Sequence, residues 1–454
     1  MKKMKAGGKL TRRTFLKSTA TALALGTFGK APIVLGQAKK FKGVTINGAC
    51  FQHVYGTYLK EYLPEFEEKT GMKVNFELPA FPIYNQRADL ELSTKGSAWD
   101  FLNITFIYTG RWIGAGWFTN LEPFLKDPNL TPPDWDPDDF VSGAQSCLRD
   151  SKGNRYGFAW EAGAMIMGVS RADIIEKAGL KLPTNFDELV QVCEAINNKE
   201  GVKAFVADKL HHWNFPPYLM GFGGAIFKDP PQNLTPTLDT PQAAEAAAYY
   251  ADLLSKYAPA GVLSYTDDQA MTAQLQGRAN IRTQAIAWMV PMSKSPKSKV
   301  KDTVRYALMP GGPAGNFPGS NSHGFGIPIG AKNKEAAWEF IKWALSKEMV
   351  RRIALEKGYS AVCRRSVIED PQYKKNLTLN GIDVASIYVK VLEMGGQTGH
   401  MKYRTVPVFP QVGDKINKAI ERIATKQQSA KEAMKQAQRE AVADLKKGGF
   451  KIDV

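Results

Sequence analysis

Hydrophobic residues in the first part of the chain switch regularly between the spacing of a strand and that of a helix. Residues 41–47 alternate apolar and polar positions, which predicts a strand, and residues 55–69 repeat apolar positions at helical spacing. A second strand is predicted at 73–78, a second helix at 84–94 and a buried parallel strand at 99–106. This order is typical of a doubly wound α/β sheet.

The rest of the chain continues with buried runs and amphipathic segments. Residues 156–169 form one long apolar run that predicts further buried strand. Helices are predicted at 171–178, 187–197, 241–256, 334–345, 349–357 and 412–447. A stretch rich in Gly and Pro at 309–330 is bracketed by short predicted strands at 305–308 and 324–328, so we interpret it as a loop within the fold.

The N-terminal segment has a different character from everything after it. Arg12 and Arg13 precede a Phe-Leu-Lys triplet at 15–17, then a weakly apolar run at 19–35 and the small-residue end 36–38. This order resembles a twin-arginine signal peptide. We therefore expect residues 1–38 to direct export to the periplasm through the twin-arginine pathway.

A membrane anchor is the alternative interpretation of that run. It contains Lys30, glycines and threonines, and it is too short and polar to span a bilayer stably. No later stretch of about 20 apolar residues follows, so we expect a soluble mature protein that is not embedded in the membrane. The first cysteine, Cys50, lies too far from the expected cleavage point to carry a lipid anchor.

The cysteines give little sign of metal chemistry. They stand alone in the sequence, without CxxC spacing or a Cys/His cluster, which argues against zinc, and no cofactor is expected. Their spacing leaves open whether they form disulfides. The four are Cys50, Cys147, Cys193 and Cys363.

The formal charge of +16 overstates how basic the protein is. Eight of the 60 Lys and Arg residues lie in 1–38, which holds no acid, so the surplus beyond that segment is +8. It is spread along the chain without a basic stripe interleaved with aromatic residues, so a nucleic-acid partner is not expected.

Length and aromatic content favour a binding cleft. About 416 residues after the signal segment are too many for one core, so two lobes are expected. Nine Trp and sixteen Tyr favour a stacking surface for a ring-shaped ligand, although large cores also use aromatic residues.

Several short motifs follow one another in a recognisable order. They lie at 44–48, 66–74, 99–101, 115–121, 156–161, 178–189, 333–341 and 358–362. In this order they resemble the family 1 extracellular solute-binding proteins of ABC transporters, the maltose-binding-protein-like family. The segment Ala-Gly-Leu at 178–180, followed by Pro-Thr-Asn-Phe-Asp-Glu-Leu at 183–189, is similar to one of that family's signatures.

The resemblance implies a two-lobe periplasmic binding protein fold of type II. Each lobe would be a mixed sheet flanked by helices, an α/β architecture, with the ligand cleft between the lobes. The implied boundaries are 39–157 plus 283–335 for lobe 1, and 158–282 plus 336–454 for lobe 2. The implied function is capture of a sugar, polyol or sugar derivative by a monomer, which delivers it to ABC transporter permease subunits.

The resemblance also implies ligand-binding residues at strand ends and loops that face the cleft. Glu161 falls where the family holds sugar hydroxyls, Trp213 resembles a stacking position, and Tyr359 a position that contacts hydroxyls. The full set of candidates is His53, Tyr55, Tyr84, Thr105, Tyr108, Trp160, Glu161, Trp213, Gln284, Trp288, His323, Gly324, Tyr359 and Arg404.

Each candidate has a structural alternative. Trp160 is equally suited to the core, the alternative for Trp213 is also a core position, and Arg404 is either an anchor for a carboxylate or sulfonate or a surface charge. The adjacent His211 and His212 cannot readily face one metal ion, so we interpret them as surface histidines.

Two departures from the family's sequence pattern narrow the range of expected ligands. Residues 104–108 lack the charged clamp of the maltodextrin binders, and Pro-Gln-Val-Gly at 410–413 lacks the arginine of the glycerol-phosphate binders. Neither ligand is expected here.

Two other functions stay open. An exported glycosidase or lyase would need paired carboxylates, for example Glu161 with Asp100, but no recognisable pair, nucleophile elbow or metal motif is present. A sensor that docks on a chemoreceptor would share the same fold. We expect a binding protein and not an enzyme.

Overall fold

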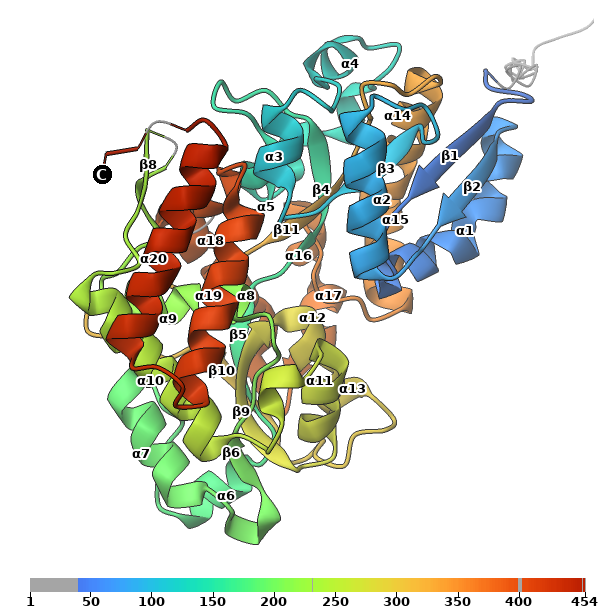
Figure 1. Cartoon of the computed structure of the whole chain (residues 1–454). Helices are drawn as coiled ribbons and strands as arrows, with labels where there is room; N and C mark the ends of the chain where they lie inside the picture. The colour runs from blue at the N-terminus through green and yellow to red at the C-terminus, as the bar shows by residue number, and fades with distance from the viewer. Residues whose placement is uncertain (1–39, 231, 399–401, 451, 454) are drawn as a thin grey trace, which may run out of the picture. The chain divides into compact units, whose positions relative to one another are not determined.

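The computed structural model describes residues 40–230, 232–398, 402–450 and 452–453. The predicted signal peptide, residues 1–38, lies outside these described residues. The strands form two larger sheets and two short hairpins, and helices cover the larger sheets (Figure 1).

The first sheet has five strands in the order β2-β1-β3-β11-β4. Strand β1 pairs in parallel with β2 and β3, whereas β11 runs antiparallel to both β3 and β4. The sheet is therefore mixed, with β11 inserted from late in the chain. Its strands are β1 (Thr45–Ala49), β2 (Lys73–Glu77), β3 (Phe101–Ile104), β4 (Gly157–Ala162) and β11 (Ser322–Gly326).

Helices α1 (Val54–Thr70), α2 (Phe81–Ser93) and α14 (Lys334–Ala344) accompany this sheet. The first ends at Gly71, whose φ of 76° is readily adopted by glycine and whose N–H is donated to the Glu67 carbonyl. Phe340 of α14 stacks on Phe101 of β3 with ring centroids 4.1 Å apart. Helix α14 thus packs on the first sheet, whereas residues 336–344 of this helix were expected in lobe 2.

The second sheet has four strands in the order β10-β5-β9-β6. Strand β5 lies antiparallel between β10 and β9, and β6 joins β9 in parallel. Every residue of β5 and of β9 is buried. This matches the apolar sequence of β5, whereas β9 also buries polar and charged side chains, among them Arg282 and Gln284. The strands are β5 (Met165–Val169), β6 (Lys203–Phe205), β9 (Ala279–Ala285) and β10 (Arg305–Leu308).

The strand pairing changes sheets at other residues than the expected lobe boundaries, which stay a prediction. Strand β4 belongs to the first sheet, so the chain leaves it after Ala162 rather than after Gly157. Strand β10 pairs with β5, so the return to the first sheet follows Leu308 rather than preceding Thr283. The apolar run at 156–169 is therefore two strands in different sheets, because hydrophobicity alone does not identify a pairing partner.

The C-terminal helical segment is two helices instead of one. Helices α19 (Phe409–Ala424) and α20 (Ala430–Lys447) lie side by side and pack against α10 (Pro241–Tyr257) (Figure 1). Ser429 caps α20, accepting from the Glu432 N–H while the Glu432 carboxylate accepts from the Ser429 N–H. That capping box starts a new helix inside the predicted single one.

The remaining elements are short or peripheral. The helices are α3 (Thr109–Gly114), α4 (Glu122–Lys126), α5 (Ser142–Gln145), α6 (Ala172–Lys177), α7 (Phe186–Ile196), α8 (His211–Asn214), α9 (Pro216–Gly221), α11 (Asp267–Leu275), α12 (Ile286–Met289), α13 (Pro291–Lys294), α15 (Lys347–Glu356), α16 (Arg365–Ile368), α17 (Pro371–Asn376) and α18 (Val384–Thr398). The hairpins are β7 (Phe227–Asp229) with β8 (Asn233–Pro236), and β12 (Thr378–Leu379) with β13 (Ile382–Asp383). Single 3-10 turns lie at Pro133–Trp135, Pro137–Asp139, Ser146–Leu148, Lys199–Gly201, Val262–Ser264 and Lys402–Thr405.

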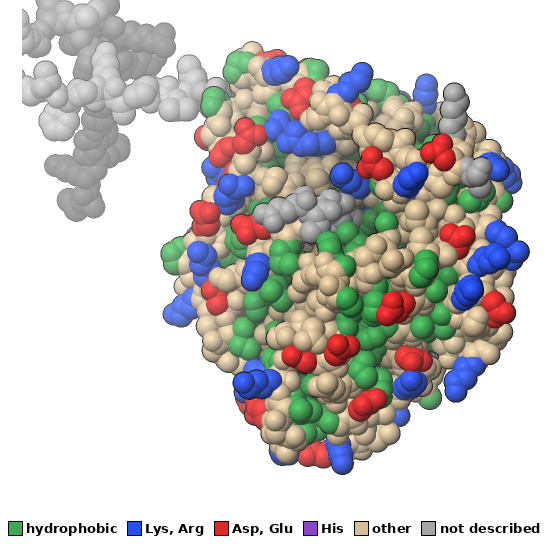
Figure 2. Space-filling view, turned by 90° about the vertical axis from the view of Figure 1, so that its left-hand side faces the viewer, with side chains coloured by type: hydrophobic (Ala, Val, Ile, Leu, Met, Phe, Trp, Pro, Cys, Tyr) green, Lys and Arg blue, Asp and Glu red, His purple; other side chains and the backbone are tan. Residues whose placement is uncertain are grey.

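The surface shown in Figure 2 carries mixed charges, and the thiols lie inside the protein. On the face shown in Figure 2, Lys and Arg side chains are intermixed with Asp and Glu. Within the described parts of the chain, no helix has both the length and the apolar character needed to cross a membrane. All four cysteines are buried free thiols.

Candidate functional site

The edge between β4 and β11 brings two candidate residues together. Glu161 and His323 are cross-strand partners, and both are buried, with 5% and 4% of their surface exposed. A register shift follows between His323 and Gly324. A Cβ on Gly324 would lie 2.4 Å from Leu148 Cδ1 and 2.8 Å from the Phe158 carbonyl, so glycine allows β11 to approach its neighbours this closely.

His53 approaches Glu161 from the start of helix α1. Its Nδ1 accepts a hydrogen bond from the Tyr55 N–H at 3.2 Å, and its Nε2 lies 3.6 Å from Oε2 of Glu161. Burial raises the pKa of Glu161 to about 8 and lowers the pKa of His53 to about 3. At neutral pH both side chains are therefore uncharged, and a neutral carboxyl group both donates and accepts hydrogen bonds.

Aromatic rings surround this pair and form one connected group, which we call the aromatic cluster. His323 lies at its centre, with its ring centroid 4.7 Å from that of Phe51 and 5.1 Å from that of Phe106. Trp160 stacks on His323 at 5.5 Å and lies 4.8 Å from His53. The members of the aromatic cluster are Phe51, His53, Phe106, Trp160, Trp213 and His323.

Other candidates hold these rings in place through hydrogen bonds within the protein. The indole of Trp160 donates to Asn103 Oδ1 at 2.9 Å, and Tyr84 donates to the Asn103 carbonyl. Tyr55 stacks on Trp160 at 5.2 Å and donates its hydroxyl to the Ala344 carbonyl at 2.9 Å. The hydroxyls of Tyr55 and Tyr84 are thus already paired with backbone carbonyls, so these residues stabilise the position of the aromatic rings.

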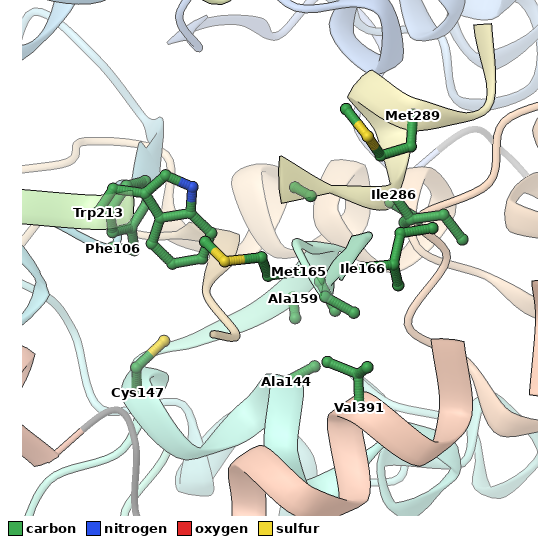
Figure 3. Packing of buried hydrophobic residues seen from close by; sticks show 14 of the residues in the cluster. Phe106, Ala144, Cys147, Ala159, Met165, Ile166, Trp213, Ile286, Met289 and Val391 are labelled. Carbon is green, nitrogen blue, oxygen red and sulfur yellow. The ribbon is translucent and has the colours of Figure 1, made fainter. Parts of the chain in front are cut away.

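Trp213 extends the cluster toward the second sheet. It lies beside Phe106, with ring centroids 5.6 Å apart (Figure 3). Its indole donates to Oε1 of Gln284 on β9, and Nε2 of Gln284 donates to Asp208 Oδ2 at 2.8 Å. Gln284 is therefore a buried residue whose side-chain hydrogen bonds orient Trp213, and its amide is not a free polar group.

Arg404 reaches the same rings from the 3-10 turn at Lys402–Thr405. Its guanidinium carbon lies 4.5 Å from the ring centroid of Phe106 and 5.3 Å from that of Trp213. The side chain is completely buried, so it is not the surface charge that was one alternative for this residue. Burial lowers the pKa of Arg404, because a charged group loses its hydration there.

Several buried polar atoms around the cluster have no hydrogen-bond partner within the described chain. Buried polar atoms are normally paired, so a group of unpaired atoms in one place indicates a site that presents them to something else. These atoms are Thr105 Oγ1, Asn321 Oδ1, His323 Nδ1, the Tyr359 hydroxyl, and Nε and Nη1 of Arg404. Together they offer hydroxyl, amide, imidazole and guanidinium groups to a polar ligand.

Two candidates lie apart from this cluster. Tyr108 is half-buried and stacks on Trp112 at 5.2 Å, and Trp288 is half-buried on α12. The ring contacts of the described residues do not link either one to the cluster. Their predicted role in binding stays a prediction.

The two adjacent histidines are buried, so their interpretation as surface residues was wrong. His211 Nδ1 lies 3.4 Å from the Tyr250 hydroxyl, and the His212 N–H is donated to Asn417 Oδ1 at 2.7 Å. Among the described residues, no three His, Cys, Asp or Glu side chains gather as a metal site would require.

Phe51 and Phe106 were missed by the sequence reasoning. Both follow the carboxyl ends of parallel strands, β1 and β3, where ligands of α/β sheets bind. That position was the available signal, but their apolar character made them indistinguishable from core residues.

Comparison with known proteins agrees with this architecture. The bacterial extracellular solute-binding protein family matches residues 52–351. The erythritol/L-threitol-binding protein of Mycolicibacterium smegmatis is 23% identical over 74% of this chain and 74% of its own. The mannitol-binding protein of Pseudomonas aeruginosa is 24% identical over 81% of this chain and 85% of its own.

Solved structures have the same fold. An ABC transporter solute-binding protein of Agrobacterium radiobacter K84 in complex with ribitol superposes with a TM-score of 0.78, at 23% identity, covering 88% of this chain and 98% of the other. One from Agrobacterium vitis S4 with bound D-mannitol gives 0.76 at 22% identity, with 89% and 99% covered. The fold is the two-lobe fold of these proteins, and since the family match spans well over half of the sequence, the chain belongs to the bacterial extracellular solute-binding proteins.

Proposed function

We propose that this protein is the substrate-binding component of an ABC importer and captures a sugar, polyol or sugar derivative. The observation that carries the proposal is the aromatic cluster with unpaired polar atoms at its border, among them Thr105 Oγ1, His323 Nδ1 and the Tyr359 hydroxyl. A polyhydroxylated ligand needs flat surfaces for its C–H groups and fixed partners for its hydroxyls. This cluster supplies both.

The ligands of similar proteins support an acyclic polyol or a molecule of similar size. Relatives of this chain bear the names of erythritol, L-threitol and mannitol, and solved structures with the same fold hold ribitol and D-mannitol. The neutral carboxyl of Glu161 beside neutral His53 fits such a partner, because a hydroxyl both donates and accepts hydrogen bonds.

The carboxyl groups of the site favour binding over hydrolysis. Asp208 and Asp267 both lie against Arg282, with Nη2 at 2.8 and 2.7 Å from their oxygens, so both carboxyl groups are engaged by the same guanidinium. Glu161 has His53 rather than a second carboxylate as its close partner. Glycoside hydrolysis by paired acids needs two carboxyl groups on either side of the bond that breaks.

Location and partners complete the proposal. The twin-arginine pattern at 12–17 supports export to the periplasm after folding, and the buried free thiols agree with a protein that folds before export. The loaded protein, a monomer, would then present its closed form to the permease subunits.

A thermal-shift screen tests this function. Purified protein, refolded to remove any carried-over ligand, is heated with erythritol, ribitol, D-mannitol, D-glucose, maltose and glycerol 3-phosphate. A bound ligand at 100 times its Kd stabilises the folded state by about 2.7 kcal/mol, which raises Tm. Chromatography should recover the ligand unchanged; turnover of the ligand, or no shift with any polyhydroxylated compound, would contradict the proposal.

A further inference from the structure

Three arginine side chains are completely buried among the described residues, and two of them have a carboxylate partner. Arg282 Nη2 lies 2.8 Å from Asp208 and 2.7 Å from Asp267. Arg364 Nη1 lies 3.1 Å from Asp139. This is the usual way to hold a guanidinium away from water, because an unpaired buried charge is costly.

Arg404 is the third, and it has no such partner. Its Nη2 donates to the His212 carbonyl at 3.3 Å, whereas Nε and Nη1 have no hydrogen-bond partner within the described chain. No ion pair joins it to a carboxylate of the described residues, and the sequence has no Asp or Glu at the positions outside them. The guanidinium lies over the rings of Phe106, Trp213, Tyr403 and Phe409.

The groups around Arg404 do not balance its charge. Ring faces attract a cation, but they do not replace an anion that accepts its N–H groups. The pKa of Glu161 is raised by burial to about 8, so this carboxyl is neutral at pH 7. Burial opposes the ionisation of Asp208, but Arg282 at 2.8 Å and hydrogen bonds to the carboxylate outweigh it and lower the pKa of that carboxyl, so its charge is already engaged.

Arg404 shares its rings with the candidate binding site. Phe106 lies under the guanidinium and is also 5.1 Å from His323 at the centre of the cluster. Trp213, the other shared ring, lies beside Phe106 (Figure 3). The one unbalanced positive charge identified in this region is thus at the border of the surface that would hold the ligand.

We propose that Arg404 binds a carboxylate of the ligand, so the transported solute is a sugar acid, such as an aldonate or a uronate, rather than a neutral sugar or alditol. The inference rests on the proposed function, since it names the class of polyhydroxylated ligand. A single guanidinium balances a single negative charge. A phosphate monoester carries about −1.5 to −2 at pH 7 and would leave charge uncompensated.

Isothermal titration tests this preference for a carboxylate directly. The purified protein is titrated at pH 7 with pairs of compounds that differ at one carbon. The pairs are ribitol with D-ribonate, D-mannitol with D-mannonate, and D-glucose with D-glucuronate; D-glucose 6-phosphate is a further arm. We expect each acid to bind at least about 30-fold more tightly than its neutral partner. The reason is that the neutral compound leaves the buried charge of Arg404 without a negative partner.

Each outcome has a distinct meaning. Equal or tighter binding of the neutral members would overturn the role of Arg404 and leave the proposed function standing. Tightest binding by the phosphorylated sugar would show that the site prefers a phosphate, and it would overturn the assignment of a carboxylate to the ligand. Binding by none of these compounds would contradict both proposals.

Variants test whether the preference comes from this side chain. Arg404→Gln should reduce the preference for the acid over its neutral partner to less than about threefold, while any binding of the neutral compound remains. Arg351→Gln is the control: it removes a half-exposed arginine paired with Asp370 and should retain the preference for the acid. Arg404→Met should leave Tm without ligand unchanged or higher, whereas Arg282→Met should lower it, because only Arg282 loses carboxylate partners. A comparable loss of Tm in both variants would show that Arg404 is already balanced and would overturn the inference.

Discussion

The Nε2 atom of His53 lies 3.6 Å from Oε2 of Glu161, and both side chains are uncharged at neutral pH. The contact joins the N-cap residue of helix α1 to strand β4 at the centre of the candidate site. Burial outweighs the attraction that would favour an ion pair, because removing both charges from water is costly. The site therefore meets its ligand with a carboxylic acid and a neutral imidazole.

The raised pKa of Glu161 predicts how stability depends on pH. Its value is about 8 in the folded protein against an ordinary 4.5, so folding favours the protonated form. The resulting stabilisation is fully present below about pH 4.5 and is lost as pH rises through about 8, at up to about 1.4 kcal/mol per pH unit within this window. Glu161→Gln has no such titration and should gain stability relative to the wild type between pH 5 and 9.

Urea unfolding of both proteins at pH 5, 6, 7, 8 and 9 measures this difference. Glu348→Gln, at an exposed position on α15, is the matched control and should follow the wild-type curve. Parallel curves for the wild type and Glu161→Gln would show that Glu161 is ionised in the folded protein at neutral pH.

The hydroxyl of Tyr359 is buried without a partner among the described residues. Removing it should therefore affect ligand affinity without lowering stability. Tyr359→Phe removes a polar group that forms no hydrogen bond with the described residues, so Tm without added ligand should stay the same or rise. If the hydroxyl binds the ligand, the same change should weaken affinity by roughly tenfold, the value of about one hydrogen bond.

Tyr55→Phe is the natural comparison, because its ring lies 5.2 Å from that of Tyr359 while its hydroxyl donates to the Ala344 carbonyl. It should cost about 1–2 kcal/mol of stability and leave affinity nearly unchanged. Calorimetry and titration on both variants give the two readouts. A stability loss in Tyr359→Phe equal to that in Tyr55→Phe would mean that the Tyr359 hydroxyl is paired within the protein.

Gly163 lies where the chain passes from β4 to β5, and it has no room for a side chain. Its N–H is donated to the Asn321 carbonyl at 3.0 Å, and a Cβ would lie 1.9 Å from Asn321 Oδ1. Gly163→Ala should therefore destabilise the protein by about 1–3 kcal/mol through overpacking. Asn321→Ala removes the obstructing amide.

A double-mutant cycle by urea unfolding checks this contact. The alanine at 163 should cost much less in the Asn321→Ala background than in the wild type, with a coupling of at least about 0.5 kcal/mol. Additive effects would place the strain elsewhere, for example against Ala285, whose Cβ would lie 3.3 Å away.

The adjacent arginines at 12 and 13 predict a specific export defect. Replacing both by lysine keeps the charge but removes the pair that resembles a twin-arginine signal. Cell fractionation should then find the protein in the cytoplasm with its signal segment still attached. Replacement of Lys2 and Lys3 by arginine is the control and should leave export intact; export of the double-lysine variant would argue for another pathway.

The family and the class of fold were predictable because they depend on local patterns in a fixed order. The strand-helix-strand spacing of the first hundred residues and motifs such as 178–189 are properties of neighbouring residues. Helices such as α7 and α10 begin at caps that are visible in the sequence, Asn185 and Thr240, since a cap acts on backbone groups only a few residues away.

The candidate site was predicted less evenly. His323 and Trp213 lie in the aromatic cluster and Glu161 lies beside it, but Tyr55 and Tyr84 use their hydroxyls on backbone carbonyls distant in sequence. Phe51 and Phe106 carry no polar signal and were overlooked. A residue type indicates what a side chain is able to bind, whereas its partner depends on which other segment folds against it.

The sequence by itself determined the periodicity of the elements, their order and the family to which they belong. Only the tertiary structure decided that strand β10 joins the second sheet and that β4 and β5 separate after Ala162. It also decided that Arg404 is buried over Phe106 and Trp213 with no carboxylate of the described residues beside it. The reason is physical: periodicity follows from local backbone geometry, but pairing, burial and charge balance arise between residues far apart in the chain.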